Sequence, residues 1–215
     1  MTYRIDIVSD AICPWCWIGK RNLEGALAEL GWQAELRYHP YQLNPEMPAE
    51  GVARAEYRAA KFGSLERSRE LDAQVTAAAA AAGLEFHLER QGRTPNTLNA
   101  HRLIQRAAAH GAQAAVKEAV FQAYFQDGED IGDIAVLARI GLAHGITDAA
   151  AYLAGEQDAE TVRATDAGFR QMGISGVPTF ALEKHVLFSG AMPAEQMAGA
   201  FRRGEAVLRE KGVLG

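Results

Sequence analysis

The chain has 215 residues, of which 48% are hydrophobic and 23% are charged, and its formal net charge is −5. A globular chain of this length buries roughly 70% of the surface that it exposes when unfolded, so the core needs no covalent staples. The acidic balance without a basic block argues against nucleic acid as a partner.

The first residues, MTYRIDIVSD, lack the basic start and long apolar run of a secretory signal. No apolar run approaches the roughly 20 residues that span a bilayer. We therefore expect a cytoplasmic protein without a membrane partner, although a chain from which a signal had been removed would read the same.

The first third of the chain predicts a β-α-β unit. Residues 3–9 are expected to form a strand, and residues 13–30 a helix that ends at Gly31. Residues 32–38 alternate between apolar and polar side chains, which predicts a second strand. A helical crossover of this kind joins parallel strands.

The middle of the chain, from about residue 53 to 173, predicts mostly helices. Residues 84–88 fit a short strand or an irregular segment. The expected breaks are 62–64, 83–96, 111, 128–132, 145 and 155–158. The residues expected to cap helix N-termini are Ser64, Asp133, Thr147 and Asp158.

Strands return near the end of the chain. Residues 179–182 and 186–189 predict a hairpin around residues 183–185, and Pro193 opens a last helix to about residue 210. The fold class is therefore α/β. Residues 1–50 and 174–215 would form one discontinuous domain with a single sheet, and residues 51–173 a helical insertion.

The two cysteines, Cys13 and Cys16, stand three apart where the first strand gives way to the first helix. Helix N-termini carry unpaired N–H groups and a partial positive charge, which stabilise a thiolate. Helix geometry should bury Cys16 and leave Cys13 outward, so Cys13 is the expected attacking thiol and Cys16 the resolving one. Pro14 is tolerated in the first turn and stiffens it.

Two other interpretations of the pair remain open. It could be half of a zinc site, but such a site needs four ligands and the six histidines are scattered, so we expect no metal. It could also be an inert pair. A structural disulfide is poorly placed here, because closing so short a loop stabilises by only about 2 kcal/mol.

Several separated segments resemble the DsbA family of thiol–disulfide oxidoreductases, in its FrnE-like branch. The resemblance runs over nearly the full chain. The matching segments are Cys13-Pro14-Trp15-Cys16-Trp17-Ile18-Gly19-Lys20-Arg21, Gln42-Leu43-Asn44-Pro45, Pro95-Asn96-Thr97 with Ala100-His101-Arg102, Gly176-Val177-Pro178-Thr179-Phe180, and Gly190-Ala191.

This resemblance implies a thioredoxin-like fold interrupted by an all-helical insertion. It implies that Pro178 is cis and faces the cysteines, and that Val177, Pro178 and Thr179 bind an extended substrate. The substrates would be disulfide- or thiol-containing proteins or peptides, attacked by Cys13 to form a mixed disulfide that Cys16 resolves. No cofactor is implied beyond the cysteine pair. Glutathione is an expected co-substrate, and the protein would be a monomer or a homodimer.

Other residues near the pair have two interpretations each. Asp10 could relay protons or cap the first helical turn, and Asn44, Asn96 and His101 could line the cleft or serve as ordinary caps and a hydrogen-bonded helix histidine. An apolar rim for substrates could come from Trp15, Trp17 and Phe180, with Trp17 favoured for the core.

DsbA itself has histidine where this chain has Trp15. With Pro14 and Trp15 in the active-site turn, the cysteine pair is therefore expected to have a less oxidising reduction potential than that of DsbA, which is about −120 mV.

Two other functions compete. Glutathione-dependent isomerases and transferases of the hydroxychromene-carboxylate isomerase and kappa type resemble this architecture, but they typically have serine at the position of Cys13. A holdase that binds unfolded chains through the cleft is the non-enzymatic alternative, and it would be an addition to redox activity.

Overall fold

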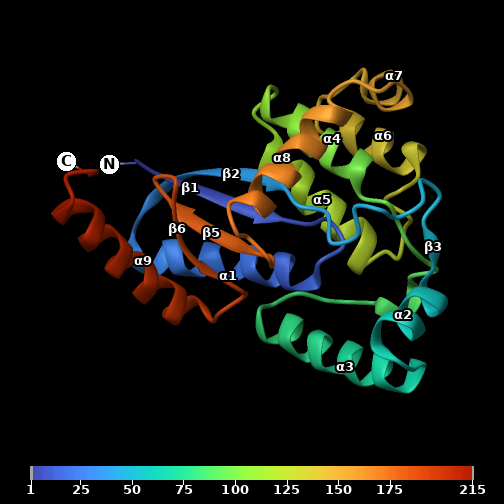
Figure 1. The fold of residues 1–215 in the computed structure, drawn as a ribbon, viewed down its shortest axis with the longest axis horizontal. Coiled ribbons are helices and arrows are strands. Elements are labelled where there is room, and N and C mark those ends of the chain that lie inside the picture. The colour runs from blue at the N-terminus through green and yellow to red at the C-terminus, as the bar shows by residue number, and fades with distance from the viewer. Residues whose placement is uncertain (1, 215) are drawn as a thin grey trace.

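A four-stranded sheet lies at the centre of the protein, seen in a computed structural model that describes residues 2–214 (Figure 1). The strand order is β2-β1-β5-β6, and β1 pairs parallel with β2 and antiparallel with β5. The predicted β-α-β unit and late hairpin are confirmed. The strands are β1 (Thr2–Ser9), β2 (Gln33–Pro40), β5 (Thr179–Leu182) and β6 (His185–Ser189).

The hairpin between β5 and β6 is tighter than predicted. His185 pairs with Leu182, so the loop is only Glu183 and Lys184 instead of residues 183–185. Both loop residues have positive φ, 48° and 68°. Two successive left-handed residues make the turn whose twist matches that of the flanking strands.

Two helices, α1 (Pro14–Leu30) and α9 (Ala194–Glu210), pack against each other beside the sheet (Figure 1). Tyr3 stacks on Trp32 of the segment before β2, and Trp32 meets Phe201 of α9 edge-on. The alternation of β1 follows from this packing, because its apolar side chains face the helices. The opposite face of the sheet carries Arg4 and Asp6, which pair with each other.

The chain between β2 and β5 forms seven helices within the described residues, and every predicted break is confirmed. Their bounds are α2 (Arg54–Phe62), α3 (Leu65–Ala81), α4 (Leu98–Ala108), α5 (Gln113–Phe125), α6 (Ile134–Ala143), α7 (Ala149–Ala154) and α8 (Ala159–Gln171).

The insertion also holds a short antiparallel ribbon of β3 (Val52–Ala53) and β4 (Arg93–Thr94), which the prediction of an all-helical insertion did not include. Residues 84–87 are irregular and lead into a 3-10 turn, Leu88–Arg90. Two-residue strands are too short to produce an alternating sequence pattern.

The predicted helix caps are confirmed in part. Ser64 accepts a hydrogen bond from Arg67 N, and Asp133 accepts one from Ala135 N. Asp158 holds the N-cap position of α8 without a side-chain cap. The predicted cap Thr147 is wrong. Helix α7 begins at Ala149, so its N-cap residue is Asp148.

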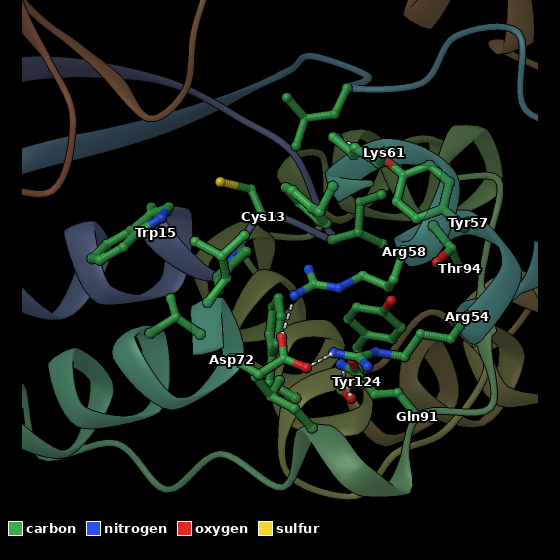
Figure 2. Close-up of a pocket in the computed structure, with 18 of the residues that line it drawn as sticks. Cys13, Trp15, Arg54, Tyr57, Arg58, Lys61, Asp72, Gln91, Thr94 and Tyr124 are labelled. Atoms are coloured by element: carbon green, nitrogen blue, oxygen red, sulfur yellow. Dashed lines mark hydrogen bonds and ion pairs between the residues drawn. The ribbon is translucent and has the colours of Figure 1, made fainter. Parts of the chain in front are cut away.

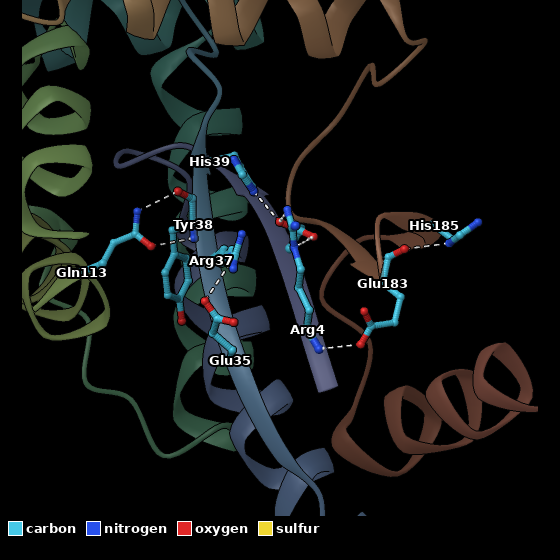
Figure 3. A network of polar contacts seen from close by, with 9 residues as sticks. Arg4, Glu35, Arg37, Tyr38, His39, Gln113, Glu183 and His185 are labelled. Carbon is cyan, nitrogen blue, oxygen red and sulfur yellow. Dashed lines mark hydrogen bonds and ion pairs between the residues drawn. The ribbon is translucent and has the colours of Figure 1, made fainter. Parts of the chain in front are cut away.

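Several contacts join the insertion to the rest of the fold, and two of them involve α1 and β2. Trp17 of α1 is 3% exposed and stacks on the rings of Phe86, Phe121 and Phe125 at 5.3–6.0 Å, which confirms that it belongs to the core. Gln113 of α5 meets the edge strand β2: its amide accepts from Tyr38 N and donates to Tyr38 O, both at 3.0 Å (Figure 3).

Most of the buried apolar side chains form one cluster across the sheet and the insertion, and a second, small cluster holds Val8, Tyr41 and Ile174. All four strands of the sheet lie within residues 1–50 and 174–215, and the division into two domains stays a prediction. Within residues 2–214, no helix combines the length and apolar character needed to cross a membrane.

Candidate active site

Cys13 and Cys16 lie at the start of α1, directly beyond the end of β1. Cys13 is the N-cap residue, and Cys16 N donates to Cys13 O at 3.0 Å. Both thiols are unlinked and buried, 4% and 2% exposed. Cys13 lines a cavity (Figure 2), whereas Cys16 does not line it, which agrees with the predicted outward and inward positions. Pro14 occupies the first helical position and also borders the cavity.

The loop before β5 approaches the cysteine pair from the other end of the chain. The Val177–Pro178 peptide bond is cis, and the Cys13 thiol donates to Val177 O with an Sγ–O distance of 3.7 Å. β5 pairs with β1 up to Val8 and Thr179. That pairing brings the loop to the end of β1 at which α1 begins.

Thr179 lies on the other side of that strand and does not line the cavity of Cys13. Its hydroxyl donates to Gly176 O at 2.8 Å and meets Ser189 Oγ at 2.6 Å. Thr179 therefore braces the loop that carries Val177.

Gly19 lets α1 approach Pro178. A Cβ atom at this position would lie 2.9 Å from Pro178 Cγ and 3.2 Å from Phe180 Cζ. Gly19 has helical backbone, so the constraint is space and not conformation. This contact explains the glycine in the motif Trp17-Ile18-Gly19. Phe180 itself is 0% exposed and belongs to the core, so its predicted place on a substrate rim is wrong.

Replacing Gly19 by alanine is expected to destabilise the protein by about 1–3 kcal/mol, because the new methyl group pushes Pro178 from the cysteines. Gly168→Ala in α8 is the matched control, since nothing lies within 4 Å of its added Cβ. It should stabilise by about 0.5–1 kcal/mol. Urea unfolding of both variants measures the difference, and equal effects would contradict this role of Gly19.

Behind the cysteines lies a buried polar cluster. Asp10 is 0% exposed, and its carboxylate accepts from Ala11 N at 2.6 Å and Leu43 N at 2.7 Å. His101 of α4 lies 3.0 Å away, Nε2 to Oδ1. Asp10 therefore does not cap the first turn of α1. His101 is the hydrogen-bonded helix histidine of the simpler interpretation, placed between the two parts of the fold.

The charges in this cluster follow from burial and hydrogen bonding. Burial raises the pKa of Asp10, but the hydrogen bonds from His101 and Leu43 N, together with the charge of Lys117, outweigh it and hold that pKa below the usual value. Burial lowers the pKa of His101 more than Asp10 raises it. At neutral pH the pair is thus a carboxylate and a neutral ring that donates from Nε2.

The two asparagines lie at the edge of the site. Asn44 Oδ1 accepts from the Tyr57 hydroxyl at 2.8 Å. Asn96 donates to Met47 O at 2.6 Å and accepts from Leu98 N at 2.9 Å, at the start of α4. Neither lines the cavity of Cys13. The simpler interpretation as loop and cap residues is therefore confirmed for Asn96.

A cavity of about 370 Å³ opens from Cys13 between α1 and the helices α2 and α3. Trp15, 43% exposed, stands at the side of Cys13 (Figure 2). Apolar side chains form much of the wall. They include Ile12, Leu43, Phe62, Leu71, Val75, Leu88 and Phe125.

The α2 side of the cavity is cationic. Arg54 and Arg58 both reach the single carboxylate of Asp72, the first at 2.7 Å (Figure 2). Lys61 Nζ donates to the Tyr57 hydroxyl at 2.6 Å, and no ion pair of Lys61 occurs within residues 2–214. Three cations against one anion favour a negatively charged ligand.

The sequence analysis did not identify these three cations or a fourth, Lys117, as site residues, although their helical spacing could have indicated them. Arg54, Arg58 and Lys61 are spaced i, i+4, i+7, which puts them on one face of a helix. Lys117 of α5 is 1% exposed beside the cluster of Asp10 and Cys16. It stands at i−4 from the core residue Phe121, on what helical spacing marks as an apolar stripe.

No three His, Cys, Asp or Glu side chains among residues 2–214 lie close enough to hold a metal ion. The site instead holds two thiols. Cys13 lies on the cavity wall next to the carbonyl of Val177, and Cys16 does not line the cavity.

Comparison with known proteins gives consistent matches over nearly the whole chain. A family model described as a DSBA-like thioredoxin domain matches residues 4–202. A probable DsbA oxidoreductase from Streptomyces coelicolor is 29% identical, with a TM-score of 0.82 over 99% of this chain and 92% of that one. The uncharacterized protein YwbO of Bacillus subtilis is 26% identical over 191 residues, 87% of this chain and 90% of its own.

The cytosolic disulfide reductase DsbM from Pseudomonas aeruginosa, in a structure with GSH, is 21% identical. Its TM-score is 0.63, over 98% of this chain and 100% of DsbM. At that identity the similarity shows a shared fold.

Proposed function

Because the chain belongs to the DSBA-like thioredoxin domain family, we propose that it is a thiol–disulfide oxidoreductase in which Cys13 attacks and Cys16 resolves. The observation that carries this is the position of the Cys13 thiol. It lies on a cavity wall, at the N-terminus of α1 and 3.7 Å from Val177 O.

In the first step, the Cys13 thiolate attacks one sulfur of a bound disulfide. The S–S bond breaks, its electron pair leaves on the other sulfur, and a mixed disulfide to Cys13 remains. The helix N-terminus stabilises the attacking thiolate. Backbone groups of Val177 would hold an extended substrate beside the sulfur.

In the second step, Cys16 attacks Cys13 Sγ and releases the substrate as a thiol, which leaves a disulfide between the two cysteines. Burial, followed by the hydrogen bond and charge of Cys13, raises the pKa of the Cys16 thiol well above its usual value. Cys16 therefore stays protonated until the mixed disulfide has formed, which separates the roles of the two sulfurs.

We propose disulfide- or thiol-containing proteins and peptides as substrates and glutathione as a co-substrate. Glutathione carries two carboxylates and one ammonium group, and the cationic α2 side of the cavity suits that net negative charge. DsbM, which shares the fold, is named with GSH. We further propose a cytoplasmic location and a monomer or homodimer.

Lys61→Ala is expected to weaken glutathione binding by up to about fivefold, because an exposed charge contributes up to about 1 kcal/mol. The effect should shrink with added salt. Arg202→Ala, an exposed cation of α9, is the matched control and should bind as the wild type does. Calorimetric titration of the reduced protein measures both, and equal affinity in the two variants would contradict a glutathione site on α2.

The test of the function is catalysis of insulin disulfide reduction in the presence of a thiol reductant. We expect acceleration over the uncatalysed reaction. A protein that leaves insulin unreduced but binds glutathione tightly would instead favour the glutathione-dependent isomerase or transferase alternative. If a Cys13→Ser/Cys16→Ser variant still suppresses the aggregation of unfolded chains, holdase activity is separate from redox activity.

A further inference from the structure

A fully buried cation lies behind the cysteine pair and has no part in the two steps above. Lys117 is 1% exposed, and its Nζ lies 4.6 Å from the centroid of the Phe121 ring. No ion pair of Lys117 with a carboxylate within 4 Å occurs among residues 2–214. A buried ammonium without such a partner is costly, so nearby charge must compensate it.

The groups that face Lys117 come from three elements. They are Cys16 and Cys13 at the start of α1, Asp10 in the loop before it, and His101 of α4. Burial lowers the pKa of Lys117 to about 8, and Cys16, Asp10 and Cys13 each oppose that fall. Lys117 in turn opposes the rise in the pKa of the Cys16 thiol.

Beside Lys117, new negative charge can form on two groups, the sulfurs of Cys13 and Cys16. Asp10 is already an anion, held by three donors: Ala11 N, Leu43 N and His101 Nε2. Its carboxylate keeps Lys117 protonated at neutral pH but is not itself a ready base. Of these two sulfurs, that of Cys16 belongs to the residue that does not line the cavity and is 2% exposed. Lys117 lies over the Phe121 ring, and that ring stacks at 5.9 Å on Trp17, the residue next to Cys16. The resolving sulfur is therefore the buried group near Lys117 whose charge changes during the reaction.

We propose that Lys117 sets the rate of the resolving step, as a positioning residue whose ammonium stabilises the thiolate that Cys16 forms. This inference rests on the proposed function. Cys16 releases its proton to solvent, its thiolate bonds to Cys13 Sγ, and the bond from Cys13 to the substrate sulfur breaks. The electron pair leaves on the substrate thiolate, which takes a proton from water. Asp10, fixed by His101, keeps Lys117 charged throughout.

Dithionitrobenzoate separates the two steps, because each half of this aromatic disulfide leaves as a coloured thiolate. Reduced protein mixed with an equimolar amount should release one thiolate on attack by Cys13 and a second on resolution by Cys16. Lys117→Met should slow the second release at least about tenfold at neutral pH and move its pH profile about one unit or more upward. The first release should change less than the second.

Two variants separate charge from packing. Lys117→Arg keeps the positive charge and should keep the second release within about threefold of wild type. Lys20→Met is the matched control: Lys20 is a nearly buried lysine of α1 that pairs with Glu24 and Glu118, both at 2.6 Å. It acts on neither cysteine and should leave the pH profile of the second release unchanged.

Thermal melts report whether each variant is folded. If Lys117→Met does not fold, Asp10→Asn replaces it, because loss of that carboxylate discharges Lys117 and should also slow the second release. A second release with wild-type rate and pH profile in the folded variant of this pair overturns the inference. Absence of both releases in the wild type would instead contradict the proposed function.

Discussion

Cys13→Ser is expected to lower disulfide reduction at least about a thousandfold, which is the scale on which removal of a nucleophile acts. A serine hydroxyl forms no anion near neutral pH, so the first step stops. Cys16→Ser should behave differently. Its Cys13 still attacks, but the mixed disulfide is not resolved, and the substrate stays attached.

Two measurements check this pair of variants. The rate of insulin reduction should fall in both, and intact mass should show one substrate moiety on Cys16→Ser and none on Cys13→Ser. Met172→Ser, at a methionine that is 71% exposed, is the control for loss of a sulfur side chain and should keep wild-type activity. An adduct on Cys13→Ser, with none on Cys16→Ser, would reverse the proposed roles.

Local signals in the sequence predicted the elements that build the site. The strand-to-helix junction at Cys13 and the alternation of β2 are both confirmed, because a helix period and a strand period are properties of short segments. The expected position of Pro178 came from the resemblance. The short ribbon of β3 and β4 left no such pattern.

The interior of the site depends on contacts between segments that are far apart in the sequence. Such contacts could not be predicted from the residue types at single positions. Asp10 meets His101 across 91 positions of the chain, and a carboxylate next to a helix start reads equally well as a cap. Lys117 gave a usable signal on the apolar stripe of α5. Lysines are mostly exposed in proteins, so the sequence favoured an exposed position for Lys117. In the structure Lys117 is buried, which is an exception to that tendency.

His101 and Arg102 are adjacent in one motif but serve different neighbours. Consecutive helix residues point about 100° apart, so α4 turns His101 toward Asp10 and Arg102 toward α7. Arg102 is 2% exposed, and its guanidinium donates to five acceptors. Its acceptors are Tyr152 O, Leu153 O, Gly155 O, Gln157 O and Asn99 Oδ1.

Arg102→Leu is therefore expected to destabilise the protein by about 3–5 kcal/mol, the largest effect we expect on folding. Its physical cause is the set of carbonyls around the end of α7, which would lose their donor while remaining buried. Arg102→Lys should recover only part of this loss, since one ammonium cannot span acceptors that the planar guanidinium reaches. The free energy of unfolding in urea measures both variants.

Arg106→Ala is the matched control, one turn further along α4. Arg106 also lies over the Tyr152 ring, at 4.6 Å, but it is partly exposed and pairs with Asp148 at the surface. Its loss should cost at most about 1 kcal/mol. Equal costs at positions 102 and 106 would mean that the buried carbonyls find other partners. A large difference would mean that Arg102 holds α7 against the helix that carries His101 to the cysteines.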